Sequence, residues 1–123
     1  MRTVGKLAVT GVAALLSLVA TASASPGLRP NDHGCPRGYV CIYPRDAGWN
    51  NNHPSYRFYY YGVHNLHNQF GTHRVFNNQY DQASANLCPR YNTCFLEGMA
   101  WIRASEWGDY NLTPVNSISL VLA

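Results

Sequence analysis

The sequence contains one cysteine-bounded motif twice. It reads CPRGYVC at residues 35–41 and CPRYNTC at residues 88–94. Each copy is Cys-Pro-Arg followed by four residues that end in cysteine, and the two copies hold all four cysteines of the chain. Two equally spaced pairs predict two similar halves, each entered through a short loop that its own cysteine pair closes.

The cysteine pairing follows from this repeat. Four cysteines allow three connectivities, and the repeat favours Cys35–Cys41 and Cys88–Cys94. Each bridge would close a loop of about seven residues and contribute roughly 2 kcal/mol in the chain-entropy model. Such bridges are better suited to stiffening a loop than to holding a domain together. A zinc site made of the four thiols is the alternative, although metal-binding pairs usually enclose two to four residues, fewer than each pair encloses here.

The N-terminus has the features of a secretory signal peptide. Arg2 and Lys6 precede an apolar stretch at residues 7–20, and the segment Ala22–Ala24 has the small-x-small form of a cleavage site. The apolar stretch is too short to span a bilayer. We therefore expect residues 1–24 to be removed on export, which leaves a secreted, extracellular chain without a membrane anchor, in surroundings where disulfides persist.

Removal of the signal peptide leaves a chain of nearly balanced charge. The whole sequence has nine Lys and Arg and six Asp and Glu residues, and the basic residues beyond residue 24 are all scattered arginines. Without a basic stripe, nucleic-acid binding is not predicted. The remaining length predicts a flexible leader at residues 25–34 and one domain at residues 35–123. We expect this domain to be a monomer without a cofactor.

Short aromatic and β-branched segments, separated by Gly, Asn and Pro, predict an all-β domain. Strands are expected at residues 39–43, 56–61, 73–76, 95–96, 99–103 and 117–121. Residues 62–71 and 105–113 are predicted to be loops, and residues 81–87 give no clear signal. Many short strands are typical of a sandwich or barrel, and duplicated halves indicate paired Greek keys.

Four segments carry a resemblance to a known family. They are CPRGYVCIY at 35–43, YYYGVHNLHNQ at 59–69, VFNNQ at 75–79 and LTPVNSISL at 112–120. Together they resemble the small secreted peptidase inhibitors of actinomycetes, family thirty-six of the peptidase-inhibitor classification, which are related to the secreted metalloproteinase inhibitor. The resemblance implies a βγ-crystallin-like sandwich of two Greek-key halves, with a local disulfide at the head of each half.

The resemblance also implies a function, the inhibition of an extracellular peptidase of the metallo or serine type. In the characterised metalloproteinase inhibitor the reactive bond follows the first cysteine of the second pair, and the matching bond here is Cys88–Pro89. Thermolysin-like enzymes favour a bulky apolar residue after the cleaved bond, which Pro89 is not. The candidate reactive loop is therefore Pro89, Arg90, Tyr91 and Asn92. Arg90 and Tyr91 are its expected anchors, because Arg and Tyr are favoured at binding hot spots.

The alternative is a secreted protein of βγ-crystallin type without a peptidase target, with a structural, calcium-binding or killer-toxin-like role. Asn51, Asn52 and Ser55 are weak calcium candidates, since they match the beginning of a βγ-crystallin calcium motif. Ca²⁺ takes six or more oxygen ligands, and the segment that contains these residues has no carboxylate.

The remaining histidines, aromatic residues and carboxylates are expected to have structural instead of functional roles. His64, His67 and His73 are expected to be structural or surface residues, because no carboxylate or free thiol lies near them in sequence. The aromatic residues of 56–61, with Trp101 and Trp107, are expected in the core instead of on a sugar-binding surface. The sequence has no Gly-x-Ser-x-Gly motif, and its carboxylates are scattered, so it does not predict an enzyme.

Overall fold

The computed structural model describes residues 31–94 and 98–122. The predicted signal peptide, the first part of the leader and the strand expected at 95–96 lie outside these residues. The strands of the described part are β1 (Asn31–Asp32), β2 (Cys35–Pro36), β3 (Val40–Ile42), β4 (Tyr56–Phe58), β5 (Gly62–Asn65), β6 (Thr72–Asn77), β7 (Ser84–Cys88), β8 (Ala100–Ile102), β9 (Trp107–Asn111) and β10 (Ser117–Val121). No helix of this part is long and apolar enough to cross a membrane.

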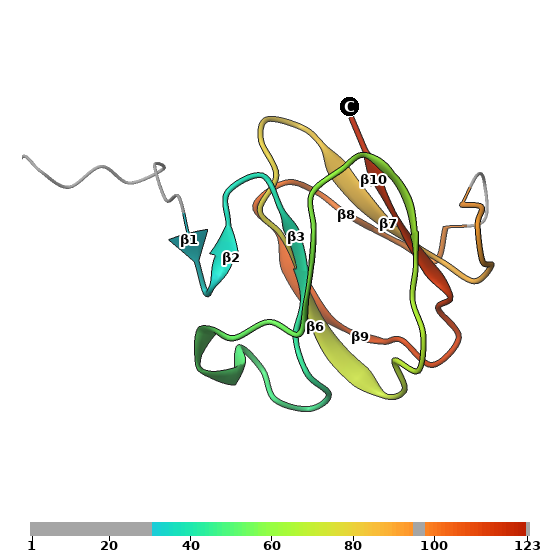
Figure 1. The fold of residues 1–123 in the computed structure, drawn as a ribbon, viewed down its shortest axis with the longest axis horizontal. Coiled ribbons are helices and arrows are strands. Elements are labelled where there is room, and N and C mark those ends of the chain that lie inside the picture. Colours follow the sequence, from blue (N-terminus) through green and yellow to red (C-terminus); the bar gives the residue numbers. More distant parts are fainter. Residues whose placement is uncertain (1–30, 95–97, 123) are drawn as a thin grey trace, which may run out of the picture.

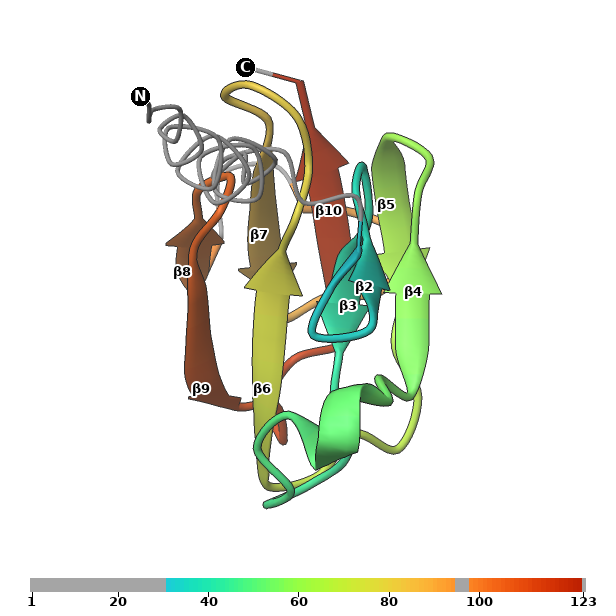
Figure 2. The ribbon, with the colours of Figure 1, turned by 90° about the vertical axis from the view of Figure 1, so that its left-hand side faces the viewer.

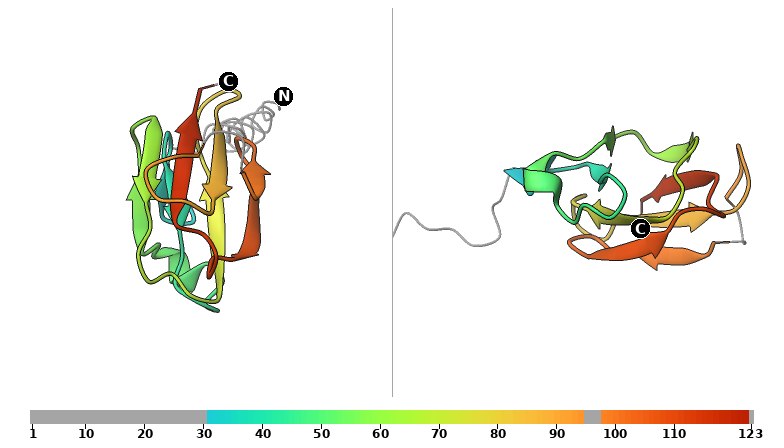
Figure 3. Two further views of the ribbon diagram at one scale, coloured as in Figure 1. Left: turned by 90° about the vertical axis from the view of Figure 1, so that its right-hand side faces the viewer. Right: turned by 90° about the horizontal axis from the view of Figure 1, so that it is seen from below.

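Eight of these strands form two four-stranded antiparallel sheets that lie against each other as two layers (Figures 1 and 3). One sheet has the strand order β4-β3-β6-β9, and the other has the order β5-β10-β7-β8. The short strands β1 and β2 form a separate hairpin. The prediction of an all-β chain with two local disulfides, Cys35–Cys41 and Cys88–Cys94, is confirmed.

The two halves of the chain exchange one strand each. β3, β4 and β6 of the first half form a sheet with β9 of the second half, and β7, β8 and β10 of the second half form a sheet with β5 of the first. Figure 2 shows the first of these sheets in front of the other. Neither half therefore completes a sheet from its own strands.

Both exchanged strands correct the sequence analysis, which predicted loops at 62–71 and 105–113. β5 and β9 are edge strands, and most of their side chains are exposed or half-buried. Their sequences, Gly-Val-His-Asn and Trp-Gly-Asp-Tyr-Asn, contain the Gly, Asn and Asp residues that strands usually avoid. β5 and β9 are therefore strands because they pair with neighbouring strands. Their local sequence preference does not favour the strand conformation.

The main core lies between the two sheets and is mostly aliphatic. Alternating residues of paired strands face it, as when Ile118 of β10 lies opposite Leu87 of β7 and Leu120 lies opposite Ala85. The fully or almost fully buried members of this core are Val40, Ile42, Leu66, Val75, Ala85, Leu87, Ile102, Leu112, Val115, Ile118 and Leu120. Its stability comes from burying aliphatic surface of both halves together.

A second, aromatic cluster covers the outer face of the β4-β3-β6-β9 sheet. Because side chains alternate along β3, Val40 and Ile42 face the main core while Cys41 faces outward. Cys41 is buried there with Cys35, Tyr43 and Phe76, and partly buried Tyr39 and Trp49 pack against them. The disulfide of the first loop is thus part of a buried cluster on the outer face of this sheet.

The hairpin of β1 and β2 closes over this second cluster. His33, in its turn, stacks on Trp49 with 3.7 Å between ring centroids, and its carbonyl accepts a 2.6 Å hydrogen bond from the Tyr43 hydroxyl. Gly34 has a φ of 78°, and a Cβ atom there would overlap the carbonyl of Asn52. Residues 31–34, the end of the predicted flexible leader, thus belong to a packed hairpin.

Candidate functional site

The second cysteine loop, residues 88–94, presents its central residues to solvent. Cys88 is buried at the end of β7, while Arg90, Tyr91, Asn92 and Thr93 are all exposed. The predicted reactive-loop residues therefore do lie together on one exposed loop, with the half-buried Pro89 at its base.

Side-chain amides from two other segments hold this loop. Asn65 of β5 accepts a 2.8 Å hydrogen bond from the backbone N–H of Asn92 and donates a 2.7 Å bond to the Asn92 side chain. Asn116 donates a 2.8 Å bond to the carbonyl of Pro89. The two backbone groups that are held, Pro89 C=O and Asn92 N–H, lie on either side of the Arg90–Tyr91 peptide bond.

Further contacts fix the rest of the loop. The Ser117 hydroxyl lies 3.4 Å from the carbonyl of Thr93, and the Tyr91 ring stacks on His67 with 5.5 Å between centroids. The supporting residues come from β5, the 66–71 connection and the start of β10, which are distant from the loop in sequence. The sequence analysis missed Asn65 and Asn116, because nothing in a lone asparagine indicates which loop it will bond.

The first cysteine loop, residues 35–41, occupies a different position. Cys35 and Cys41 are completely buried, and Gly38 between them is buried too. This loop precedes and enters β3, whereas the second loop follows β7. The expectation that each half begins with a cysteine-closed loop is therefore met in the first half and is wrong in the second. The second pair joins the end of the half's first strand to the segment leading toward β8.

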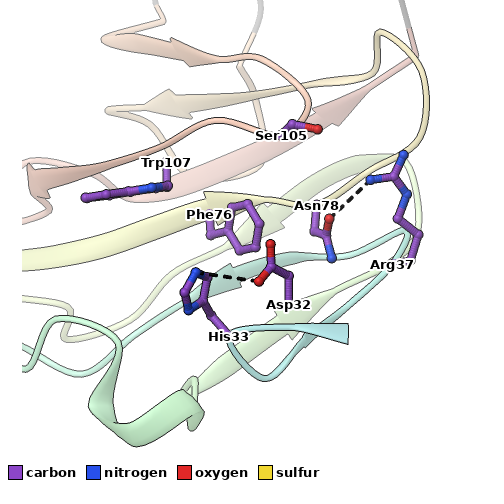
Figure 4. Close-up of a pocket in the computed structure, with 7 residues that line it drawn as sticks. All are labelled: Asp32, His33, Arg37, Phe76, Asn78, Ser105 and Trp107. Atoms are coloured by element: carbon purple, nitrogen blue, oxygen red, sulfur yellow. Dashed lines mark hydrogen bonds and ion pairs between the residues drawn. The ribbon is translucent and has the colours of Figure 1, made fainter. Parts of the chain in front are cut away.

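A hollow of about 360 Å³ lies beside the first loop (Figure 4). Its lining combines an acid, two bases, an amide, a hydroxyl and two aromatic rings: Asp32, His33, Arg37, Phe76, Asn78, Ser105 and Trp107. His33 Nε2 lies 3.5 Å from the Asp32 carboxylate. Arg37 lies 3.3 Å from the Asn78 amide oxygen, and the amide nitrogen of Asn78 donates to the carbonyl of Cys35.

The hollow contains the residue types of a Ser-His-Asp triad but not its arrangement. Ser105 lies on the far side of Phe76 from His33 (Figure 4), and a nucleophile must lie within hydrogen-bond reach of its base. The His33 ring is also stacked flat on Trp49, with 5° between their planes. These contacts give Asp32 and His33 a role in packing the hairpin onto the second cluster.

Tyr43 lies beneath the β1–β2 hairpin, which excludes solvent from its side chain. Burial, with a smaller effect of the Asp32 carboxylate, raises the pKa of the Tyr43 hydroxyl to about 12. The side chain is completely buried, and its hydroxyl donates to the His33 carbonyl. The ring therefore anchors the hairpin from inside.

Arg74 is held at the outer end of the second cluster. Its guanidinium lies 4.8 Å from the ring of Trp49 and 4.1 Å from that of Trp107, and it makes two hydrogen bonds of 2.8 and 2.9 Å to Asp109. These bonds hold the pKa of the Asp109 carboxyl below its usual value. Because its guanidinium bonds to Asp109 of β9, Arg74 ties the exchanged strand to its sheet.

The calcium candidates belong to a turn and its exit, where two of them have other contacts. Asn51 and Asn52 are exposed on a short turn with left-handed backbone, where φ is 52° and 65°. The carbonyl of Asn51 is 2.8 Å from His53 Nδ1, and the Ser55 hydroxyl donates to the carbonyl of Ile42. The sequence of this segment is explained by turn geometry, since asparagine tolerates left-handed conformations.

The histidines are distributed among separate structural contacts. His73 is buried with its two ring nitrogens 2.8 Å from the Tyr43 carbonyl and 3.0 Å from the Phe70 carbonyl. His64 contacts the Tyr60 carbonyl, and His67 stacks on Tyr91. Within residues 31–94 and 98–122, no three His, Cys, Asp or Glu side chains gather as a metal site would require.

The expectation that the aromatic residues form the core holds for Phe58, which is partly buried against the main core, and is wrong for the others. Of the residues in question, those that are exposed are Tyr56, Tyr59, Tyr60, Tyr61, Trp101 and Trp107. Aliphatic residues fill the space between the sheets, which leaves these large rings on edge strands and connections.

Comparisons of this chain with protein-family models, with curated proteins and with solved structures find no match. Arguments about function therefore rest on the residues and contacts described above.

Proposed function

We propose that the chain is a secreted inhibitor of an extracellular peptidase and that the loop of residues 88–94 enters the peptidase cleft. One observation carries this proposal. The tip of the loop is exposed, while its base is fixed by the Cys88–Cys94 disulfide and by the amides of Asn65 and Asn116. A loop that is ordered before binding avoids the entropy cost that a flexible peptide incurs.

The arrangement of the contacts favours one peptide bond as the one that faces the enzyme. The carbonyl of Pro89 and the N–H of Asn92 are both held, so the Arg90–Tyr91 bond lies between two fixed points. If a peptidase cleaved this bond, the disulfide and the two amides would keep both new ends in place. The product would then remain bound and the bond could re-form. Arg90 before this bond favours a trypsin-like serine peptidase, whose specificity pocket accepts a basic side chain.

The finer features of the fold and location belong to the same proposal. We infer that the two halves are Greek keys of the βγ-crystallin kind, as the resemblance to actinomycete peptidase inhibitors implies, and the exchange of β5 and β9 supports this. The signal-like N-terminus and the two disulfides support export.

A panel of peptidases tests the proposal. The purified chain should inhibit trypsin, and prior reduction of its disulfides should abolish inhibition. Arg90→Ala should weaken inhibition at least tenfold, since Arg is a typical hot-spot residue. Arg37→Ala is the matched control, because Arg37 occupies the same place in the other cysteine loop, and it should leave inhibition unchanged. Failure to inhibit trypsin, subtilisin and a thermolysin-like enzyme at micromolar concentration would refute the proposal.

A further inference from the structure

One end of the sandwich carries a group of exposed aromatic side chains, here called the aromatic end. Its members and their exposed fractions are Tyr59 (51%), Tyr60 (75%), Tyr61 (55%), Tyr80 (56%) and Trp101 (58%). They lie just before β5, between β6 and β7, and in β8. The loop of residues 88–94 is attached at the other end of β5, through Asn65. Gathered exposed rings of this size mark an interaction surface.

The aromatic end is hollowed on both sides of the segment 79–84. On one side, a hollow of about 130 Å³ is lined by Gly38, Tyr59, Tyr60, Tyr61, Gln79 and Tyr80. On the other side, a hollow of about 580 Å³ is lined by Asp81, Gln82, Ser84, Trp101, Arg103 and Ala104. The larger volume lies within the range of roughly 300–1,000 Å³ that is typical of small-molecule sites.

Several of the rings are supported from behind. The ring of Tyr59 packs against that of Tyr39, with 5.0 Å between centroids. The guanidinium of Arg37 lies 4.9 Å from the centroid of the Tyr80 ring. Rings held in this way offer a flat surface without a large loss of side-chain entropy on binding.

The segment between the hollows is also fixed. The buried Asn77 side chain donates to the carbonyls of Ala83 and Ile102 and accepts two hydrogen bonds from Gln79, one from its backbone and one from its side chain. The Gln79 side chain also lies 3.2 Å from the carbonyl of Ser84. Tyr80 therefore extends from a segment whose ends are tied to β6, β7 and β8.

From this combination we propose that the aromatic end binds an uncharged polysaccharide with β-1,4-linked sugar rings. Such rings present C–H groups on their flat faces and hydroxyl groups at their edges. The faces pack on Tyr and Trp rings, while the hydroxyls bond to groups around them. The hollows supply both partners: rings, and the polar groups of Gln82, Ser84 and the tyrosine hydroxyls.

The polar groups beside the rings suit a sugar chain. None of the described residues that line either hollow is Leu, Ile, Val or Met, and the amide and hydroxyl side chains next to the aromatic rings can bond to a sugar's hydroxyl groups. Among the described residues, the charged ones that line the hollows are Asp81 and Arg103, one of each sign, so this lining favours a ligand without net charge. This proposal is independent of the peptidase loop.

Binding to insoluble cellulose and chitin, followed by titration with soluble β-1,4-linked oligosaccharides, tests the inference. The chain should be retained on at least one of the two polymers. Tyr60→Ala, Tyr80→Ala and Trp101→Ala should each weaken oligosaccharide binding about tenfold. Phe70→Ala is the control: Phe70 is equally exposed, at 54%, but lies in the connection between β5 and β6 at the opposite end, and its loss should leave binding unchanged.

Thermal unfolding of each variant separates loss of binding from loss of fold. Three results would overturn the inference: no retention on either polymer, equal weakening by Phe70→Ala, or binding that survives all three substitutions. A drop in peptidase inhibition in Tyr60→Ala without a drop in sugar binding would likewise assign the aromatic end to a protein interface. Because inhibition and sugar binding are measured separately, failure of one proposal leaves the other testable.

Discussion

The two copies of the cysteine motif have the same spacing and share four of their seven residues, but their environments are opposite. In the first loop the cysteines and Gly38 are buried, and Arg37 is turned onto Tyr80 and Asn78. In the second loop the arginine and the three residues after it are exposed, and amides from elsewhere hold its backbone. The comparison teaches that cysteine spacing determines how a loop is closed, while the surrounding segments determine whether it packs or is presented.

The largest predicted difference is in the effect of removing each disulfide. Replacing Cys35 and Cys41 with alanine should lower the free energy of unfolding by about 3–4 kcal/mol, because it removes both a crosslink and buried atoms. Replacing Cys88 and Cys94 should cost about 2–3 kcal/mol, because it removes the crosslink and the buried atoms of Cys88 alone, and it should abolish peptidase inhibition. Denaturant unfolding and inhibition assays on both double variants check this. The reverse order of stability losses would break the comparison.

Alkaline pH should also act on the first loop's cluster. Burial raises the pKa of the Tyr43 hydroxyl to about 12, above its ordinary value of 10.0. Folding therefore favours the protonated hydroxyl, and this contribution is complete below pH 10 and is lost as the pH rises through 12. The free energy of unfolding should fall by about 2–3 kcal/mol over that range.

Tyr43→Phe provides the reference for this measurement. The variant retains the buried ring and lacks the ionisable group, so its unfolding free energy should fall less steeply between pH 10 and pH 12. Superimposable pH profiles for the two proteins would show that the Tyr43 hydroxyl does not titrate in this range.

A smaller difference is expected at the fourth position of each motif. Gly38 has a φ of 97°, and a Cβ atom there would lie 3.2 Å from Tyr80 and 3.3 Å from Tyr59. Gly38→Ala should therefore cost about 1–2 kcal/mol. Tyr91 occupies the matching place in the second loop, and Tyr91→Ala should change stability by less than about 0.5 kcal/mol. Thermal melts of the two variants measure the contrast, and equal losses would contradict it.

The two arginines should give the smallest difference in stability. Arg37→Ala loses its interactions with Tyr80 and Asn78 and should cost about 0.5–1 kcal/mol. Arg90→Ala should act mainly on peptidase binding, because Arg90 is exposed in the second loop. Measuring unfolding and inhibition on the same two samples would show whether the two effects are separated as expected.

The sequence predicted several strands that bury aliphatic residues, because alternation or β-branching makes them visible. It gave no clear signal for β7, which buries Ala85 and Leu87 but lacks β-branched residues. The last strand was expected at 117–121 and is observed there, and the strand expected at 39–43 is observed at 40–42. The exchanged strands were missed, since their pairing depends on partners far away in the chain. A loop and an edge strand rich in Gly and Asn have the same local pattern.

The candidate site was predictable to a similar extent as the fold: its local features were predicted, and its long-range contacts were not. The disulfides and the exposed residues Arg90 and Tyr91 follow from a local motif. The hydrogen bonds from Asn65 and Asn116 to this loop could not be predicted, because they join residues that are far apart in sequence and no local pattern indicates them. The tyrosines at 59–61 and Trp101 were misassigned to the core for a related reason: composition tells how many rings a chain has, and topology determines which face of a sheet they occupy.

The strand exchange has a consequence for how the molecule is made. Each half contributes one strand, β5 or β9, to the sheet of the other half. Neither half can therefore fold first and dock afterwards, because its own sheet is incomplete without the other half. Most of the stabilising pairings join residues far apart in sequence, which slows folding. Two fragments divided within residues 79–83 should therefore stay unfolded alone and recover structure only when mixed, with each half serving as the template on which the other folds.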